Sequence, residues 1–359
     1  MNVLIFRNYN QTVNNHIAEL QLLIGLKSKG VDITYIGNGK EENLKLLQKN
    51  NITVIENFFT GSFNLSFIKK LREFILKNEF EIMHLFIAKQ LRYSIPSTLN
   101  LPIKIVAYFG SSSLHWHDPS AYLTFLSPRV NKIICNSEYV FQHVKKQLIK
   151  KNKAVKIYKG YDKNWFNDVI AFDYTTLGIP KNDLIICTVA RNTKVKGIKY
   201  FIEASKELSD YKNVHFIIIG GKTNTAKVHK SIKNFSNHKN IHLLGYRKDV
   251  ISLIKGADIY TQTSLSEGLG RAISEAMCLR KPIVMTDAGG CTELIEDGKS
   301  GIIVPIKSPI AIAKAWKELV KSSELRLNMG KAAQQAIKDN FNIQTTIEET
   351  YQLYKKLLK

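Results

Sequence analysis

The sequence is poor in cysteine and has no long apolar run. Four cysteines occur in 359 residues, at positions 135, 187, 278 and 291, without a CxxC pair or a histidine cluster at metal-ligand spacing. We therefore expect buried free thiols in a reducing cytosol, and no bound metal. The apolar stretches fall short of the ~18–20 residues that span a bilayer. The opening MNVLIFRNYN turns polar after four apolar residues, which indicates a first strand and not a secretion signal.

Acidic residues are scarce relative to basic ones. The chain has 30 Asp and Glu against 52 Lys and Arg, a net charge of +22. Such an excess favours an anionic partner. Nucleic acid is not favoured as that partner, because no RNP, KH or helix-turn-helix signature is present and basic charge alone is a weak indication.

Short apolar, β-branched runs alternate with amphipathic segments along the chain. Runs of this kind are typical of strands covered on both faces, and their alternation with helical segments predicts parallel sheets. A stretch without clear period, 158–182, separates two series and is the expected hinge. The first series lies at 3–6, 31–37, 81–86, 103–110 and 131–137, and the second at 183–192, 213–221, 240–246, 257–264, 281–287 and 300–305.

This pattern predicts an α/β protein with two Rossmann-like, doubly wound parallel-sheet domains. The length exceeds the ~250–300 residues at which a single core stops growing. We place the first domain at 1–165 and the second at 166–340, and expect 341–359 to be a helix that crosses back to the first domain. Because ligands of such sheets bind at the carboxyl ends of the strands, the two domains would face one cleft.

The second series opens with a strand that runs into ARNTKVKG, residues 190–197. Arg191 and Lys196 follow its carboxyl end, and Gly197 permits a close turn before the next helix. The guanidinium group of an arginine can bind two oxygens of a diphosphate, and the ammonium group of a lysine can neutralise its charge, so the two residues together suit a diphosphate. A solvated loop in a lysine-rich chain is the other interpretation, and these residues alone leave both open.

The segment SLSEGLGRAISEAM, residues 264–277, has the features of an anion site at a helix start. Ser264 or Ser266 is a candidate cap, and Gly268 and Gly270 free the backbone around the first turn. Exposed N–H groups and the positive end of the helix dipole would then attract an anion.

Two glutamates of this segment, Glu267 and Glu275, also have ordinary structural explanations. Arg271 and Glu275 are four residues apart, as in a surface ion pair on one helix face, and Glu267 would complement the helix dipole. A glycosidase pair is not favoured, because it needs carboxyl groups ~5–9.5 Å apart, whereas eight helical residues span ~12 Å.

Two further loops follow strands of the second series. Gly289 and Gly290 come after the strand at 281–287 and offer a second close approach of the backbone. Tyr246 and Arg247 end the strand at 240–246, where their side chains could flank a planar base.

Taken in order, these segments resemble those of the retaining GT-B glycosyltransferases, specifically the large family four. The match is specific over about 183–340 and loose over the first half, although 157–166 is similar to the family's hinge. The family's R…KG element is matched by Arg191, Lys196 and Gly197, its EGxGxxxxEA element by 267–276, its GGxxE element by 289–293, and its last glycine turn by 297–304.

The resemblance implies metal-independent transfer from a nucleotide-sugar donor, most simply UDP- or GDP-linked, with no cofactor. Glu267, Arg191 and Lys196 would be catalytic, with Glu267 facing the sugar and the two cations holding the diphosphate. Positive groups aimed at the departing diphosphate stabilise the transition state more than the ground state. Glu275 would bind the ribose, and the other donor-binding residues would be Gly268, Leu269, Gly270, Arg271, Tyr246, Arg247, Gly289 and Gly290.

The first half departs from the family pattern at two positions. Family members usually show a Gly-Gly pair after the first strand, where this chain has RNYNQTVNNH at 7–16. They also often carry a histidine where this chain has Phe109. His115 or His117 would replace it, beside Gly110 and Ser111 on the acceptor side, and an aromatic-rich loop that only packs is the alternative.

Basic clusters of the first half suggest where the acceptor comes from. Residues 1–165 hold 23 Lys and Arg against 11 Asp and Glu, with clusters at 65–80 and 144–156. These clusters predict peripheral docking to an anionic membrane, at the cytoplasmic face of the inner membrane. A solvated, lysine-rich face is the alternative.

The sequence as a whole predicts a retaining hexosyltransferase that acts on a cell-envelope glycan or lipid-linked acceptor, in lipopolysaccharide, capsule or glycolipid synthesis. A GT-B sugar-nucleotide epimerase and a non-catalytic basic binding protein on the same scaffold are the alternatives. Turnover of any nucleotide sugar would separate them.

Overall fold

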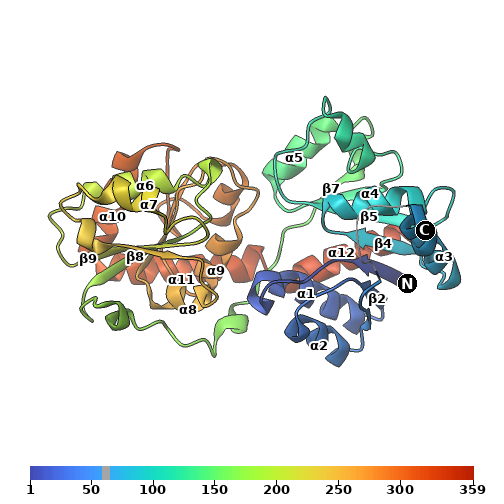
Figure 1. The fold of residues 1–359 in the computed structure, drawn as a ribbon, viewed down its shortest axis with the longest axis horizontal. Helices are drawn as coiled ribbons and strands as arrows, with labels where there is room; N and C mark the ends of the chain where they lie inside the picture. Colours follow the sequence, from blue (N-terminus) through green and yellow to red (C-terminus); the bar gives the residue numbers. More distant parts are fainter. Residues whose placement is uncertain (59–64) are drawn as a thin grey trace. The chain divides into compact units, whose positions relative to one another are not determined.

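The protein folds into two compact α/β units. The computed structural model describes residues 1–58 and 65–359. The first unit comprises Met1–Gly160 with Ile343–Lys359, and the second comprises Tyr161–Asn342. Each is built around one parallel sheet (Figure 1). The chain changes unit after Gly160, slightly before the boundary at 165 expected from the sequence, and returns to the first unit after Asn342.

The sheet of the first unit has the strand order β3-β2-β1-β4-β5-β6-β7, with neighbouring strands parallel. Two three-residue strands, β3 and β7, were not expected from the sequence. They lie at the sheet's two edges and are only partly buried, so they lack the apolar run of a covered strand. The strands are β1 (Asn2–Phe6), β2 (Asp32–Ile36), β3 (Thr53–Ile55), β4 (Ile82–Leu85), β5 (Lys104–Phe109), β6 (Lys132–Cys135) and β7 (Ala154–Lys156).

The C-terminal helix α12 (Ile343–Leu358) belongs to the first unit and packs along α1 (Val13–Ser28), as Figure 1 shows in red and blue. A glycine allows this close approach, because a Cβ at Gly25 would lie 2.2 Å from Cδ1 of Ile347. The other helices of this unit are α2 (Glu41–Lys49), α3 (Leu65–Lys77), α4 (Ala88–Ser97) and α5 (Glu138–Gln147).

The apolar side of α3 packs into the core of the first unit. Phe67, Leu71 and Ile75 are buried there, with Phe74 packed against them. Most of the amphipathic pattern at 65–80 is therefore explained by folding. The exposed apolar side chains left on this helix are Leu65 and Leu76.

The second unit has a sheet of order β10-β9-β8-β11-β12-β13, again parallel throughout. The six strands of the second series are confirmed. This order is that of a Rossmann sheet, in which the direction of winding reverses between β8 and β11. The strands are β8 (Leu184–Val189), β9 (Val214–Ile219), β10 (Ile241–Gly245), β11 (Ile259–Gln262), β12 (Ile283–Thr286) and β13 (Ile302–Val304).

Helices cover this second sheet and enclose a core that includes the buried Trp316. Its indole N–H donates to the hydroxyl of Thr261 on β11 at 2.8 Å. The four cysteines of the chain are free and buried, which confirms the prediction of buried thiols. The helices are α6 (Ile198–Lys206), α7 (Ala226–Ile232), α8 (Val250–Gly256), α9 (Arg271–Cys278), α10 (Pro309–Lys321) and α11 (Ser323–Asn340).

Most of the segment expected to be a hinge is fixed to the second unit. The amide of Phe172 donates to the carbonyl of Ser252 at 2.9 Å. The hydroxyl of Tyr174 donates to the carbonyl of Leu253 at 2.8 Å, and this bond is buried. Residues 161–182 therefore belong to the second unit, and 166–174 contact α8.

Candidate functional site

Two loops of the second unit meet where the sheet reverses its winding. The first, residues 190–197, follows β8, and the second, residues 263–270, follows β11. Gly197, the last residue of the first loop, has φ +62°. A Cβ at this position would lie 1.9 Å from the carbonyl oxygen of Thr263 in the second loop. Glycine is therefore required for the two loops to touch, at the point of the fold where Rossmann sheets bind ligands.

The contact brings Lys196 and Glu267 together. Nζ of Lys196 lies 2.5 Å from Oε1 of Glu267, which also accepts a hydrogen bond from the Ser264 hydroxyl at 2.8 Å. The lysine side chain is 33% exposed and the glutamate 11%. Two residues that the sequence assigned to catalysis thus form one partly buried pair.

A chain of buried hydrogen bonds leads to this pair from inside the sheet. Tyr260 donates to Gln262, which donates to Ser264, which donates to Glu267. Tyr260 and Gln262 were not singled out from the sequence, and the expectation that Ser264 or Ser266 caps the helix is wrong. Helix α9 begins only at Arg271, and its cap residue is Gly270. The signal that could have revealed Tyr260 and Gln262 is the run of polar residues YTQTS, 260–264, where the other strands of this sheet are mostly apolar.

The Glu267 loop is also held by the glycine pair that follows β12. The Glu267 amide donates to the Ala288 carbonyl, and the Gly290 amide donates to the Glu267 carbonyl at 3.1 Å. Gly289 pairs with Glu267 in an isolated parallel bridge and has φ +94°. The two glycine elements singled out from the sequence are therefore parts of one loop cluster, with Gly268 and Leu269 buried within it.

Glu275 is buried, at 3% exposure, within α9. Nε of Arg271, one turn earlier, lies 3.5 Å from Oε1 of Glu275, and the arginine side chain is 44% exposed. The ion pair expected as the alternative is therefore formed, but its glutamate is buried instead of lying at the surface.

Three other candidates have different surroundings. Arg191 is exposed at the end of β8 and forms no ion pair with any residue that the structure describes. Tyr246 is 65% exposed after β10. Arg247 is held by Asp249 through two hydrogen bonds, of 2.8 and 2.5 Å, which raise the pKa of the guanidinium. Tyr246 and Arg191 are thus accessible to a ligand, whereas Arg247 is held by a neighbour.

The acceptor-side candidates lie in the first unit, in the loop after β5. Phe109 fills a core position against Phe125, with ring centroids 4.7 Å apart. His115 and His117 stack on each other at 5.2 Å and are exposed. Gly110 precedes them, and Ser111 hydrogen-bonds Ser113 at 2.9 Å.

A buried charged cluster follows β1 in the first unit, and sequence reasoning missed it. Glu19 of α1 lies 3.2 Å from Nε of Arg7 and 3.5 Å from Nζ of Lys159. Burial by itself raises the pKa of Glu19, but Lys159 and Arg7 outweigh it and hold the pKa below its ordinary value of 4.5. Arg7 opens the segment 7–16, in which the resembling family usually has a Gly-Gly pair, and here it forms an ion pair with Glu19.

Two family models together match most of the chain. The model described as Glycosyltransferase Family 4 matches residues 16–165, and the model described as Glycosyl transferases group 1 matches residues 171–336. The chain belongs to the family 4, group 1 glycosyltransferases. The Lys196–Glu267 pair and buried Glu275 lie in the part matched by the second model.

Solved structures share the GT-B fold of this chain over nearly its whole length. A glycosyltransferase from Rickettsia africae has a TM-score of 0.82 and 22% identity, over 100% of this chain and 98% of that one. Anabaena Alr3699/HepE, solved in complex with UDP-glucose, has a TM-score of 0.80 and 18% identity, over 99% and 100%.

Curated relatives match this chain over a shorter length. The N,N'-diacetylbacillosaminyl-diphospho-undecaprenol alpha-1,3-N-acetylgalactosaminyltransferase of Campylobacter jejuni is 31% identical over 52% of this chain and 48% of that protein. The capsular polysaccharide biosynthesis glycosyltransferase CapM of Staphylococcus aureus is 27% identical over 50% and 47%. The chain thus spans about half the length of these relatives. None of its described helices is long and apolar enough to cross a membrane.

Proposed function

We propose that this glycosyltransferase transfers a sugar, with retention of its anomeric configuration, from a nucleoside diphosphate donor to a glycan or lipid-linked acceptor of the cell envelope. The observation that carries the proposal is the Lys196–Glu267 pair at the point where β8 and β11 diverge. The pair provides a cation for the departing diphosphate and a carboxylate for the donor sugar.

The roles follow from charge and exposure. Lys196 and Arg191 stabilise the negative charge that develops on the departing diphosphate, so the reaction proceeds without a metal ion. Glu267 faces the donor sugar, held in place by Ser264. Buried Glu275 accepts hydrogen bonds from the ribose hydroxyls, and Tyr246 covers the base.

The donor and acceptor classes are supported by the relatives. The Anabaena structure contains UDP-glucose, so we propose a UDP-linked sugar as donor, with a GDP-linked sugar as the second choice. The name of the Campylobacter relative mentions a lipid diphosphate, diphospho-undecaprenol. The name of the Staphylococcus relative mentions capsular polysaccharide biosynthesis. We therefore propose an acceptor built on such a lipid carrier, consumed in the assembly of a surface polysaccharide.

A membrane contact of the first unit fits such an acceptor, and the end of α5 supports it better than α3 does. Ile149 is 91% exposed and is followed by the exposed Lys150 and Lys151. Trp116, 63% exposed, donates its backbone N–H to Gln147 of α5. Basic side chains beside an exposed aromatic and an aliphatic group are typical of a surface that touches an anionic membrane.

A donor screen tests the proposed function. Wild-type protein is mixed with UDP-, GDP- and ADP-sugars, and the melting temperature and the release of nucleoside diphosphate are measured with and without EDTA. A ligand at 100 times its Kd adds ~2.7 kcal/mol of stability, so the true donor raises the melting temperature. We expect a UDP-sugar to be selected and EDTA to leave the rate unchanged. Absence of both stabilisation and turnover with every sugar would overturn the proposal.

A further inference from the structure

A row of polar side chains lies on one face of β11, inside the core of the second unit. Tyr260 and Gln262 share this face because side chains alternate along a strand, and Ser264 continues the alternation just beyond the end of β11. All three residues are buried. The Thr261 hydroxyl, on the opposite face, instead accepts a hydrogen bond from Trp316. The polar row is therefore confined to one face of the strand.

Each hydrogen bond of this row has one direction. The Tyr260 hydroxyl donates to Oε1 of Gln262 at 2.7 Å, and Nε2 of Gln262 donates to the Ser264 hydroxyl at 2.8 Å. That hydroxyl in turn donates to Oε1 of Glu267 at 2.8 Å. An amide has one accepting and one donating end, and a serine hydroxyl has a single proton. Because Ser264 accepts from Gln262, its own proton is left for Glu267.

Tyr260 fixes which way round the amide of Gln262 lies. Burial raises the pKa of Tyr260 well above its ordinary value of 10, so the phenol keeps its proton and donates it to the oxygen end of the amide. The nitrogen end is thereby turned toward Ser264. The direction of the last bond, to Glu267, thus depends on two residues that do not touch the carboxylate.

Stability alone does not require these polar groups. Replacing buried hydrogen-bonded partners by apolar groups of the same shape can be nearly neutral, whereas a buried polar group without a partner is costly. The buried side-chain atoms of Tyr260, Gln262 and Ser264 all have partners. A fully satisfied network of this kind rigidifies what it holds, and at its end it holds the carboxylate of Glu267.

Glu267 needs a second holder if Lys196 is to serve the diphosphate. Lys196 and Ser264 contact the same oxygen, Oε1 of Glu267, at 2.5 and 2.8 Å. When a diphosphate draws the ammonium group away, the bond from Ser264 remains. The Thr286 hydroxyl donates to the carbonyl of Ser264 and fixes its backbone. The freedom left to Ser264 is the rotation of its own hydroxyl, and Gln262 restricts that rotation.

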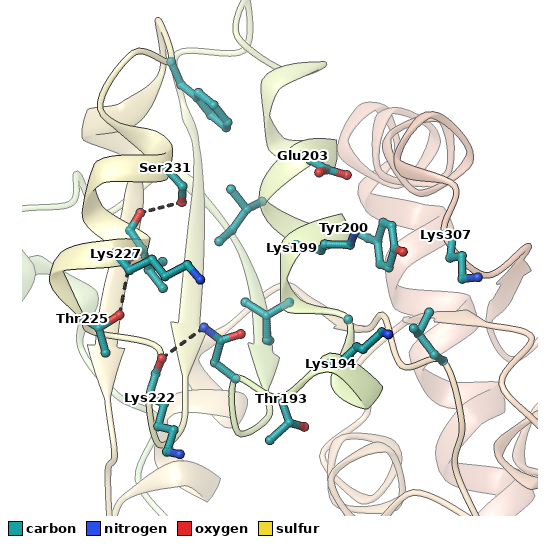
Figure 2. A pocket seen from close by; sticks show the side chains of 17 residues that line it. Thr193, Lys194, Lys199, Tyr200, Glu203, Lys222, Thr225, Lys227, Ser231 and Lys307 are labelled. Atoms are coloured by element: carbon teal, nitrogen blue, oxygen red, sulfur yellow. Dashed lines mark hydrogen bonds between the residues drawn. The ribbon is translucent and has the colours of Figure 1, made fainter.

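The polar row does not line the pocket that Figure 2 shows. That pocket is lined mainly by residues of α6, α7 and the loops that follow β8 and β9, among them Thr193 and Lys194. Tyr260 and Gln262 are absent from its lining and are buried. Any effect of these two residues on the reaction therefore passes through Ser264 and does not come from contact with a ligand.

We propose that Gln262 and Tyr260 are positioning residues for the sugar transfer. They direct the Ser264 hydroxyl at Glu267, so that the carboxylate keeps its place when the diphosphate engages Lys196. The inference rests on the proposed function, because it requires Glu267 to face the donor sugar.

The test is a double-mutant cycle in the full chain. Gln262→Met removes both polar ends of the amide and keeps most of its volume, Tyr260→Phe removes only the hydroxyl, and Ser264→Ala breaks the last bond of the row. kcat and the KM for the donor are measured with the nucleotide sugar that the donor screen selects. Thr261→Val, at a buried residue on the opposite face of the same strand, is the matched control for lost stability.

We expect Gln262→Met to lower kcat by about tenfold, the scale of one hydrogen bond to a charged group, with the KM unchanged. Tyr260→Phe should lower kcat less. In the Ser264→Ala background, neither change should lower kcat further, and Thr261→Val alone should leave kcat unchanged. Losses that multiply in that background would overturn the proposal, because Gln262 would then act by another route. A normal kcat in either Gln262→Met or Tyr260→Phe, or an equal loss in Thr261→Val, would also overturn it.

Melting temperatures give a readout that needs no substrate. The effects of Gln262→Met and Glu267→Gln on the melting temperature should not add, because both changes break one connected network. They should add in the Ser264→Ala background, where the connection is already lost. Additive effects without Ser264→Ala would overturn the positioning role. Coupled melting temperatures without turnover of any nucleotide sugar would overturn the proposed function and still support the hold of Gln262 on Glu267.

Discussion

The ammonium group of Lys196 lies 2.5 Å from the carboxylate of Glu267, and the two residues come from loops that follow different strands. Without a ligand, each group neutralises the other. A bound diphosphate would compete with the carboxylate for the lysine. The pair thus holds a cation in position at the carboxyl edge of the sheet.

Replacing Lys196 by Met should lower kcat by about 10²-fold or more, the scale of losing one group that stabilises charge in a transition state. Arg191→Ala should have an effect of similar size. Initial rates with the selected nucleotide sugar provide the measurement. Lys239→Met, an exposed lysine outside the site, is the control. Near-normal rates for both site variants would rule out their role on the diphosphate.

The two glutamates should differ in what they bind. Glu275→Gln should weaken the binding of free UDP, because the proposed partners of Glu275 are the ribose hydroxyls. Glu267→Gln should not weaken UDP binding, because it removes the carboxylate that competes with the diphosphate for Lys196, and it should slow the transfer step. Calorimetry with UDP and single-turnover rates separate the two effects. Equal losses of UDP affinity would show that the division of roles is wrong.

Ser264 should act as a positioning residue for Glu267. Ser264→Ala removes one hydrogen bond to the carboxylate, and a bond to a charged group contributes about 1.5–3 kcal/mol. We expect kcat to fall by about tenfold or more with KM for the donor unchanged. A proportional rise in KM with unchanged kcat would assign Ser264 to ground-state binding.

Acid should destabilise the first unit through His84. Its Nδ1 lies 2.6 Å from the hydroxyl of Tyr354 on α12, and burial lowers its pKa from 6.5 to about 3. The neutral imidazole is therefore favoured in the folded state. Its contribution is complete above pH 6.5 and is lost as the pH falls toward 3, by up to ~1.4 kcal/mol per pH unit.

The measurement is the free energy of unfolding between pH 7 and pH 4. His84→Asn should flatten this pH dependence above pH 4.5. The lowered pKa of Glu19 adds a further loss below that pH. His229→Asn, at an exposed histidine of the second unit, is the control. A slope as steep in His84→Asn as in the wild type would contradict the assignment.

Membrane attachment, if it uses the end of α5, should depend on Ile149, Lys150 and Lys151. Changing these residues to Ser, Glu and Glu should abolish flotation with acidic liposomes at low salt. Reversal of Lys69, Lys70 and Lys77 on α3 should reduce it less, because Phe67 and Leu71 of that helix are buried in the core. Donor binding should be intact in both variants. If the wild type itself does not float, the basic surface is only solvated.

The two strand series and the order of the glycine-containing motifs could be predicted from local sequence patterns alone. These features are local: a buried parallel strand needs an apolar run, and a sharp turn after it needs glycine at positions such as Gly197 and Gly289. Each signal lies within a few residues of the element it specifies. The short edge strands β3 and β7 were not predicted from the sequence, because partly exposed strands need no continuous apolar run.

Which of these motifs meet depends on how the strands are ordered in the folded sheet. Lys196 and Glu267 are 71 residues apart, and their contact depends on the strand order, which places β8 beside β11. Burial likewise depends on packing from distant elements. It set Glu275 inside the second unit, and it buried Phe109 in the core where the resembling family often has a histidine. Which charged side chains pair depends on the residues that the fold brings next to them, and the spacing of residues in the sequence does not predict those contacts.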